Sequence, residues 1–323
     1  MFVVPSRDNM PITLHRAKYS PNLRSRGAVG ALLLLAGSLL ATGASAAIVY
    51  WDQNGSITGA GTTPTGTWDT TNSNKVWNSN SGGTTNPAKW TSGNDAVFSA
   101  GSDATGSYTV TVSGTMNASS ITIEEGTPTF TSGTVDFNDA TPDLIINSSR
   151  TLIFNSALIS TSTGGLNLSG GGTLSLGSTT SLSGTLNLGV SGTAGTTLSL
   201  NGISLTLGTL NVTANSSIDF AGTSSLNLTT LTIASGVTLT ITNWQNAADT
   251  FVTANWAGVT QNTINGSITN QVSFTGFPAT STGWESGTNQ VRPMPEPATY
   301  GALLLGLTGG LLGWRRWRKQ RAA

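Results

Sequence analysis

Short segments in which apolar and polar residues alternate recur at nearly regular intervals between residues 121 and 242. The first segment of each repeat can be started at Ile121, Leu144, Leu166, Leu186, Leu205 and Leu226, which are 19 to 23 residues apart. Second segments begin near Phe130, Leu152, Leu174, Val190, Leu210 and Leu231, and third segments near Val135, Leu158, Leu182, Leu198, Ile218 and Leu239. Three short strands in a period of about 21 residues are typical of the coils of a parallel β-helix.

The alternation also indicates which side chains form the core. In Leu226-Asn227-Leu228, a strand places both leucines on one face and the asparagine on the other. One coil cannot bury its own apolar face, but stacked coils form a continuous core. We therefore predict an all-β fold, a right-handed parallel β-helix (solenoid) with capping segments. An antiparallel sandwich or barrel is the competing architecture, because its turns would be spaced similarly.

The register of the stack yields predictions for single residues. Leu207 is predicted to point into the core, with Leu188 and Leu228 in the coils above and below it. Thr206 alternates with Leu207 and is predicted to face outward. The fourth coil, around Val190, fits the repeat worst, and its register stays open.

Charge is distributed unevenly along the chain. Charged residues make up only 9% of the 323 residues, and basic residues cluster at both ends. Between Ala47 and Val291, three cations oppose twelve acids, which leaves a net charge of −9. A body this acidic repels phosphate backbones, so nucleic acid is not an expected partner. The chain has no cysteine and its only histidine is His15, so Ser-His and Cys-His nucleophiles are not expected in the body.

Residues 1–46 have the parts of a secretory signal peptide. A basic region is followed by an apolar stretch at 28–40 and by the small residues Ala44-Ser45-Ala46. Signal peptidase is expected to cut between Ala46 and Ala47. Met10 is an alternative start, because the basic region is long. A retained N-terminal anchor is the other alternative, although the apolar run is shorter than the roughly 20 residues that span a bilayer.

The C-terminal segment, residues 293–323, also has three parts. Pro295-Glu296-Pro297 comes first, an apolar segment follows at about 299–314, and a basic cluster comes last. The cluster consists of Arg315, Arg316, Arg318, Lys319 and Arg321. Because basic residues resist translocation, we expect a short C-terminal transmembrane helix with its basic end in the cytoplasm and the body outside.

This three-part tail resembles the PEP-CTERM sorting signal of Gram-negative bacteria. The resemblance covers roughly residues 293–321 and includes the Pro-Glu-Pro motif, the apolar segment and the basic end. It implies that an exosortase-type processing enzyme in the inner membrane recognises Pro295, Glu296 and Pro297 and cuts near them. A plain C-terminal anchor that contains this tripeptide by chance is the alternative.

Motifs on both sides of the repeats resemble bacterial proteins with autotransporter-associated β-strand repeats that carry PEP-CTERM tails. Tyr50-Trp51-Asp52, Gly66-Thr67-Trp68-Asp69 and Asp95-Ala96-Val97-Phe98 precede the repeats, and Val272-Ser273-Phe274 follows them. This resemblance implies a secreted or surface-exposed β-helix.

These features together predict five segments of the chain. They are a signal peptide at 1–46, an N-terminal capping β region at 47–120, β-solenoid repeats at 121–242, a C-terminal cap and linker at 243–292, and the sorting tail at 293–323. Tryptophans occur in both capping segments and none lies between Thr91 and Asn243. We expect them to pack the caps, while a stacking platform for sugar rings is the alternative.

The strongest candidates for catalysis are the acids of one predicted turn. Asp136, Asp139 and Asp143 lie close in sequence to Arg150, and clustered carboxylates are the groups with which β-helix enzymes cleave polysaccharides. A solvated turn with a surface ion pair is the simpler interpretation. Glu124 and Glu125 are adjacent, so a strand would point them to opposite faces and they would not form a dyad.

We therefore expect a protein that is not an enzyme and that has no catalytic residues, metal or cofactor. The favoured function is a structural or adhesive protein of the cell envelope or extracellular matrix. Its expected partners are signal peptidase, the exosortase-type enzyme, the inner membrane at least transiently, and extracellular polysaccharide. It is expected to be anchored in the inner membrane first and to reach the cell surface or medium after processing. A polysaccharide-binding or polysaccharide-degrading β-helix protein is the alternative.

Overall fold

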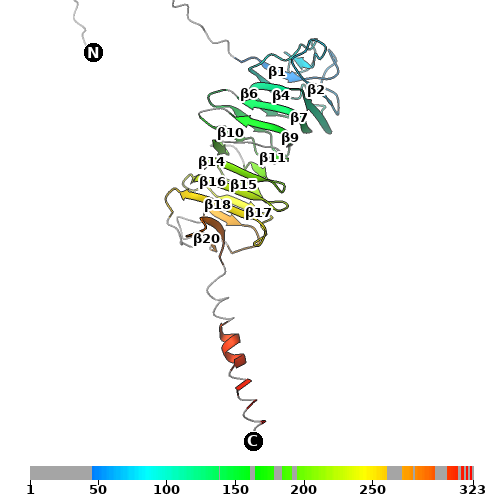
Figure 1. The fold of residues 1–323 in the computed structure, drawn as a ribbon. Helices are drawn as coiled ribbons and strands as arrows, with labels where there is room; N and C mark the ends of the chain where they lie inside the picture. The colour runs from blue at the N-terminus through cyan, green and yellow to red at the C-terminus, as the bar shows by residue number, and fades with distance from the viewer. Residues whose placement is uncertain are drawn as a thin grey trace, which may run out of the picture. The chain divides into compact units, whose positions relative to one another are not determined.

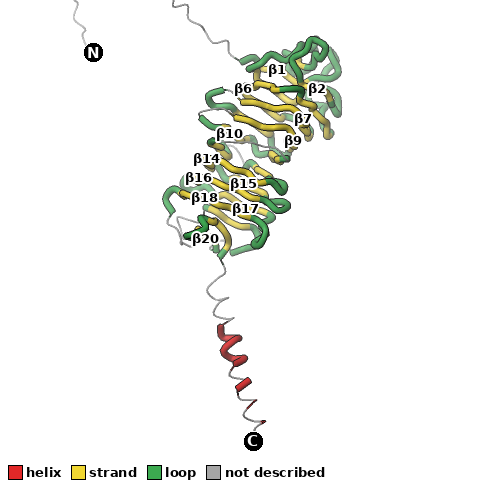
Figure 2. The backbone as a smooth tube through the Cα atoms, in the orientation of Figure 1, coloured by secondary structure: helices red, strands yellow, loops and turns green. Residues whose placement is uncertain are grey.

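The chain folds into a parallel β-solenoid of about six turns (Figure 1). The computed structural model describes residues 46–137, 139–160, 164–177, 184–190, 195–259, 271–278, 281–294, 304–311, 314–315, 318 and 321. The strands stack in register on three sides of the coil, which we call the first, second and third faces. The tube drawing shows the strands of neighbouring coils one above the other, joined by short loops (Figure 2).

The first face begins with β1 (Ile48–Trp51) and β4 (Asn94–Phe98), which pair in parallel. It continues through the C-terminal half of β6 (Thr115–Ile123), β8 (Asp143–Ile146), β10 (Leu166–Ser169) and β12 (Thr185–Leu188). The later coils contribute the C-terminal parts of β14 (Ser204–Val212), β16 (Ser225–Ile233) and β18 (Thr250–Trp256).

The second face comprises one strand segment from each successive coil. Its members are β2 (Gly66–Trp68), β5 (Ser107–Val112), the first halves of β7 (Thr127–Phe137) and β9 (Thr151–Ser160), β11 (Thr173–Leu176), β13 (Thr197–Ser199), β15 (Ser216–Asp219), β17 (Leu239–Thr242) and β19 (Val272–Phe274). Parallel pairing therefore continues on both sides of residues 121–242.

The third face is built from the remaining halves of the long strands. The first half of β6 pairs with the second half of β7, which pairs with the second half of β9. In the later coils, the first halves of β14, β16 and β18 pair in the same way. Long strands thus bend from one face to the next, so one strand serves two sheets.

The core is a stack of aliphatic and aromatic side chains that point into the coil. On the second face, Leu174 lies in register with Leu152 and Leu198, and all three are fully buried. Phe130 and Phe154 stack in the same way, with their ring centroids 5.4 Å apart. Each such side chain contributes about 1.5–3 kcal/mol by leaving water, and the strict alternation ensures that every coil supplies several. The predicted parallel stacking of apolar residues is therefore confirmed.

The structure corrects the register predicted after the fourth coil. Val190 was predicted to start a strand, but it lies outside the strands and is 39% exposed. Its place on the second face is taken by Leu198, which pairs with Leu174 below and Ile218 above. Consequently Leu186 pairs with Leu210 instead of the predicted Leu205. The coils vary in length because their turns differ. Assuming evenly spaced strand starts therefore assigned the later strands to the wrong faces.

Leu207 and Thr206 test the same register at the level of single residues. Leu207 is buried and pairs with Leu228, and Thr206 is exposed, as predicted. The predicted neighbour Leu188 is wrong, because Leu188 lies on the first face and pairs with Val212.

Tryptophans fill the N-terminal end of the solenoid. Trp51, Trp68, Trp77 and Trp90 are at most 2% exposed, and Trp77 begins the short strand β3 (Trp77–Asn78), which pairs antiparallel with β1. Edge-to-face contacts join them, such as Trp68 to Trp90 at 4.9 Å between ring centroids. Since these rings are buried, they cannot stack on sugars, and the capping interpretation is confirmed for this end.

An antiparallel hairpin closes the C-terminal end. It consists of β20 (Thr282–Glu285) and β21 (Gln290–Pro293), and Gln290 pairs with Val252 of the last long strand. Trp284 is 5% exposed and donates its indole N–H to the carbonyl of Thr253 at 3.1 Å. Trp244 and Trp256 are also buried, so these rings pack the cap and offer no platform for sugars.

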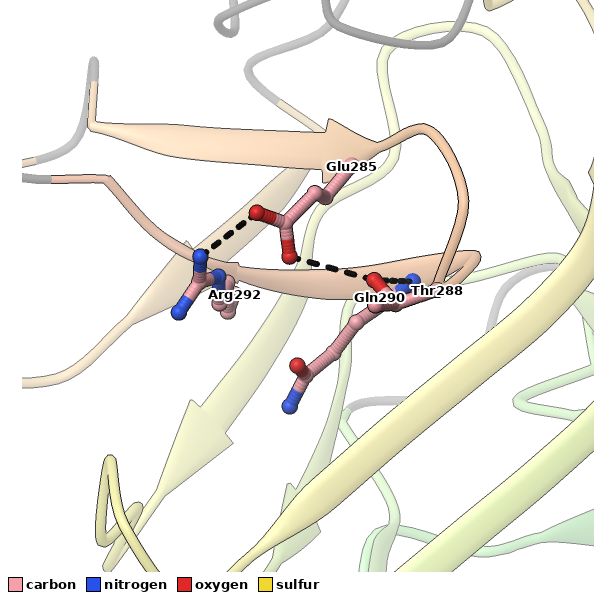
Figure 3. Close-up of polar contacts among 4 residues, drawn as sticks. All are labelled: Glu285, Thr288, Gln290 and Arg292. Atoms are coloured by element: carbon pink, nitrogen blue, oxygen red, sulfur yellow. Dashed lines mark hydrogen bonds and ion pairs between the residues drawn. The ribbon is translucent and has the colours of Figure 1, made fainter.

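Side chains across this hairpin fix its turn (Figure 3). The Arg292 guanidinium forms an ion pair with Glu285 at 2.7 Å, and the Thr288 hydroxyl donates to the other oxygen of Glu285 at 3.1 Å. Both ionic side chains are about one-third exposed, so the pair contributes little stability by itself. Its effect is to join the two strands of the hairpin beside their turn.

The predicted transmembrane segment is only partly described. Residues 304–311 are helical, and their exposed side chains include Leu304, Leu305, Leu307 and Leu311. Among the residues that the structure describes, no helix is both long and apolar enough to cross a membrane.

Candidate functional surface

The acids predicted to cluster in one turn are not brought together by the fold. Asp143 lies on the first face, where its Oδ1 accepts a hydrogen bond from the Asn167 amide at 2.9 Å. Asp139 is exposed and binds the backbone N–H of Ala140. The Arg150 guanidinium donates to the backbone carbonyl of Glu124 at 3.2 Å. Among the described residues, the predicted ion pair between Arg150 and one of these aspartates is not formed.

Asp136 lies on the third face, in register with Asn117 in the preceding coil. Its Oδ1 and the Oδ1 of Asn117 are both buried and have no hydrogen-bond partner among the described residues. Glu124 and Glu125 follow the strand β6, and the Glu125 carboxylate accepts a hydrogen bond from the N–H of Ala104 at 3.0 Å. Burial, together with the charge of Glu125, raises the pKa of the Glu124 carboxyl. No group of three or more His, Cys, Asp or Glu side chains suited to a metal is found in the described part of the chain.

A polar column runs along the outside of the first face, and its side chains bond to one another. Asp143, Asn167, Asn187 and Asn211 occupy successive coils in register. Each amide nitrogen donates to the oxygen of the preceding residue, at 2.9 Å to Asp143, 2.8 Å to Asn167 and 2.9 Å to Asn187. We call this set the asparagine ladder. Because its members satisfy each other, the ladder stabilises the stack and offers few unpaired groups to a partner.

A second column, on the outside of the second face, has a different hydrogen-bonding state. It contains only hydroxyl residues, and its paired members are Ser107 with Thr127, and then Thr151, Thr173, Thr197, Ser217, Thr240 and Ser273 in order. We call this set the hydroxyl column. None of these hydroxyls has a hydrogen-bond partner among the described residues, and each side chain is at least partly exposed. Successive hydroxyls are spaced by the strand separation, about 4.8 Å.

The hydroxyl column therefore presents donors and acceptors at a constant interval and without charge. A hydroxyl can both donate and accept, so it suits a partner that also carries hydroxyl or amide groups. The residues of this column were not singled out from the sequence, although the repeated polar position before each apolar residue was the available signal.

Most residues of the predicted signal-peptide cleavage site and sorting tail lie outside the described part of the chain. Ala44, Pro295, Glu296, Pro297, Arg316 and Lys319 are not described. Ala47, the predicted first residue after cleavage, is exposed and directly precedes β1. In the tail, Arg318 lies 4.8 Å from the centre of the Trp314 ring, a cation–π contact between one basic residue and one aromatic residue of the predicted membrane segment.

Sequence reasoning missed a set of carboxylates that hold the caps together. Asp103 accepts the N–H groups of Ala60 and Gly61 at 2.8 and 3.0 Å, across a separation of 43 and 42 residues. At the other end, the buried carboxylate of Asp249 accepts the N–H groups of Ser224 and Gln245. These acids had no distinguishing motif, because their partners are backbone groups, and three of the four lie 25 to 43 residues away in the sequence.

Comparison of the chain with protein-family models, with characterised proteins and with solved structures finds no match in any of the three. The resemblance to PEP-CTERM proteins with autotransporter-associated repeats therefore depends on the motifs themselves. What the fold supports is the β-helix that this resemblance implies.

Proposed function

We propose that this protein is an exported β-helix that acts as a structural or adhesive component of the cell envelope or extracellular matrix. The hydroxyl column is the observation that carries the proposal. A column of uncharged, unpaired hydroxyls that repeats from coil to coil is suited to repeated weak contacts along an extended partner. The acidic character of the body disfavours polyanions, so a neutral partner fits best.

Delivery to the envelope is the second part of the proposal. Signal peptidase cuts after Ala46, and the apolar segment with its basic end holds the chain in the inner membrane at least transiently. An exosortase-type enzyme then reads Pro295, Glu296 and Pro297. The order of segments supports this scheme. The predicted signal peptide and sorting tail flank a body that folds as one solenoid between Ile48 and Pro293.

Sorting is tested with Glu296→Ala, using Thr299→Ala as the matched control just outside the motif. The first variant should accumulate as a full-length species in the inner membrane, whereas the control should be processed normally. N-terminal sequencing of the exported form should begin at Ala47. Unchanged release of the Glu296 variant would leave only a plain anchor, and an intact Met1 or Met10 species in the envelope would contradict signal cleavage.

Adhesion is tested on the hydroxyl column itself. Thr173→Val and Thr197→Val remove two hydroxyls without changing side-chain shape, and Thr206→Val on the third face is the control. Surface attachment of cells should fall with the first pair and not with the control, while thermal unfolding stays nearly the same. Polysaccharide turnover that is lost only on substitution of Asp139 or Asp143 would support the degrading enzyme instead.

A further inference from the structure

The loop that follows Trp51 folds around a buried carboxylate. Asp52 is 1% exposed, and its Oδ2 accepts a hydrogen bond from the Asn78 amide at 2.8 Å. Its Oδ1 accepts the backbone N–H of Asn54 at 3.0 Å. With one oxygen held by Asn78, the other is directed toward the side chain of Asn54.

One end of the Asn54 amide meets three oxygens. The carbonyl of Ile57 lies 2.8 Å from it, Asp52 Oδ1 lies 3.0 Å from it, and the carbonyl of Gly59 lies 3.1 Å from it. The two ends of an amide are alike in size, so the surrounding groups decide whether nitrogen or oxygen faces inward. With nitrogen inward, two hydrogens face three acceptors. With oxygen inward, Asn54 Oδ1 and these three acceptors form a group of four oxygens, each of the three within 3.1 Å of Asn54 Oδ1.

The other end of the amide does not settle the choice. It lies 3.2 Å from the N–H of Gly61, which could donate a hydrogen bond to an oxygen at this position. However, this N–H already donates to Asp103 Oδ2 at 3.0 Å, so it needs no second acceptor. Turning the Asn54 oxygen inward keeps this backbone donor paired, but it places the amide nitrogen 3.2 Å from the Gly61 N–H, donor to donor, so a cation beside the inner oxygens must compensate.

We propose that this loop binds a calcium ion through Asp52 Oδ1, Asn54 Oδ1 and the carbonyls of Ile57 and Gly59. Carboxylate, amide and backbone oxygens from a short loop are the donors that Ca²⁺ takes, and water completes its six to eight ligands. Ser56, Ile57 and Thr58 are exposed, which leaves one side of the site open to water. Mg²⁺ fits less well, because it demands a near-ideal octahedron and keeps most of its waters.

The loop is held by two carboxylates, because Asp52 accepts the N–H of Asn54 and Asp103 accepts the N–H of Gly61. A divalent cation beside Asp52 would offset this negative charge. The inference does not depend on the proposed function, since it uses only the geometry of the N-terminal cap.

The site would fix the cap to the first coil. The loop starts at Trp51, whose indole N–H donates to the carbonyl of Pro64 at 2.6 Å, so the loop is closed at its base. Gly59 is also held from outside, because its N–H donates to the carbonyl of Gly82 at 2.9 Å. Binding of the ion would therefore tie two cap loops to the tryptophan core, and its removal would loosen the end of the solenoid first.

The test uses the full-length protein stripped of metal with EDTA. Addition of CaCl₂ should raise the unfolding temperature, with half-saturation in the range of roughly 0.1–1 mM that is usual for extracellular calcium modules. Calorimetric titration should detect the same binding directly. MgCl₂, and KCl at equal ionic strength, should give a much smaller shift. No calcium-dependent shift up to 10-fold above that range, or an equal shift with MgCl₂, would overturn the proposal.

Two substitutions distinguish a bound calcium ion from an Asn54 amide whose nitrogen faces inward. Asn54→Asp adds a ligand charge, so it should lower the half-saturating calcium concentration several-fold if the ion is present. If the nitrogen faces inward, the same change sets a carboxylate against three oxygens and lowers stability with or without calcium, which would refute the site. Asp52→Asn should abolish the calcium shift. Asp69→Asn in the same cap is the control, because its carboxylate binds Thr71 and Asn74, and it should respond to calcium as the unmodified protein does.

Discussion

The side-chain amide of Asn187 donates to the side-chain oxygen of Asn167 one coil away, at 2.8 Å, and accepts from Asn211 on its other side. This relationship repeats along the first face until it reaches the carboxylate of Asp143. Every donor in the asparagine ladder points toward the N-terminal coils, so the amide dipoles align toward the negative charge. The ladder therefore couples coils that are 20 to 24 residues apart in sequence.

Breaking the ladder at its centre should destabilise the solenoid. Asn187→Ala removes two side-chain hydrogen bonds, which should lower the free energy of unfolding by about 1–3 kcal/mol. Asn227→Ala is the matched control, since Asn227 also faces outward in a strand but its amide has no hydrogen-bond partner among the described residues. Urea unfolding monitored by circular dichroism checks both. Equal losses for the two variants would mean that the ladder bonds contribute nothing.

Substitutions at core and surface positions of β14 should differ sharply in their effect on stability. Leu207→Asp places an unpaired charge beside Leu228 in the core, so we expect a loss of several kcal/mol or failure to fold. Thr206→Asp changes an exposed position and should shift stability by less than about 0.5 kcal/mol. Thermal unfolding and soluble yield measure the contrast. Similar losses at both positions would refute the register described for this coil.

A glycine at a corner of the first face should resist substitution for two reasons. Gly170 has a φ of 101°, and a Cβ there would lie 2.3 Å from the carbonyl oxygen of Ile146. Gly170→Ala should therefore cost well over about 1 kcal/mol. Gly236→Ala is the control, because its φ is 75° but a Cβ would meet nothing within 4 Å. The difference in urea midpoint between the two variants isolates the steric contact from the backbone penalty.

Stability should depend on pH through Glu124. Because its pKa is raised in the folded state, the folded protein keeps this proton at a pH where the unfolded chain has lost it. The carboxyl therefore destabilises the fold as the pH rises above the unfolded value of 4.5. Glu124→Gln should match the unmodified protein below that pH and become the more stable of the two at neutral pH.

The measurement for Glu124 is the urea midpoint of both proteins between pH 4 and pH 7, in EDTA so that metal binding does not contribute. Glu125→Gln serves as a second arm, since it removes the neighbouring negative charge. When Glu125→Gln is already present, adding Glu124→Gln should raise the urea midpoint at neutral pH by less than it does in the unmodified protein. A pH-independent difference between the proteins would show that the effect is not one of ionisation.

The sequence by itself determined the fold class and the direction of most side chains. Alternation has a period of two, and this places Leu207 in the core and Thr206 in solvent whichever neighbours they have. Tryptophans confined to the ends likewise indicated caps before any contact was known. These features are local, so they can be read from a single stretch of chain.

Only the tertiary structure decided which coils pair residue to residue. Leu205, Leu207 and Leu210 are all buried, because β14 passes from one face to the next near Gly208, so alternation cannot tell Leu205 from Leu210 as the partner of Leu186. Turn lengths settle the register, and these vary from coil to coil. For the same reason, the asparagine ladder, the hydroxyl column and the oxygens around Asn54 depend on groups that the stacked coils and cap loops bring together, and no local pattern in the chain specifies those distances.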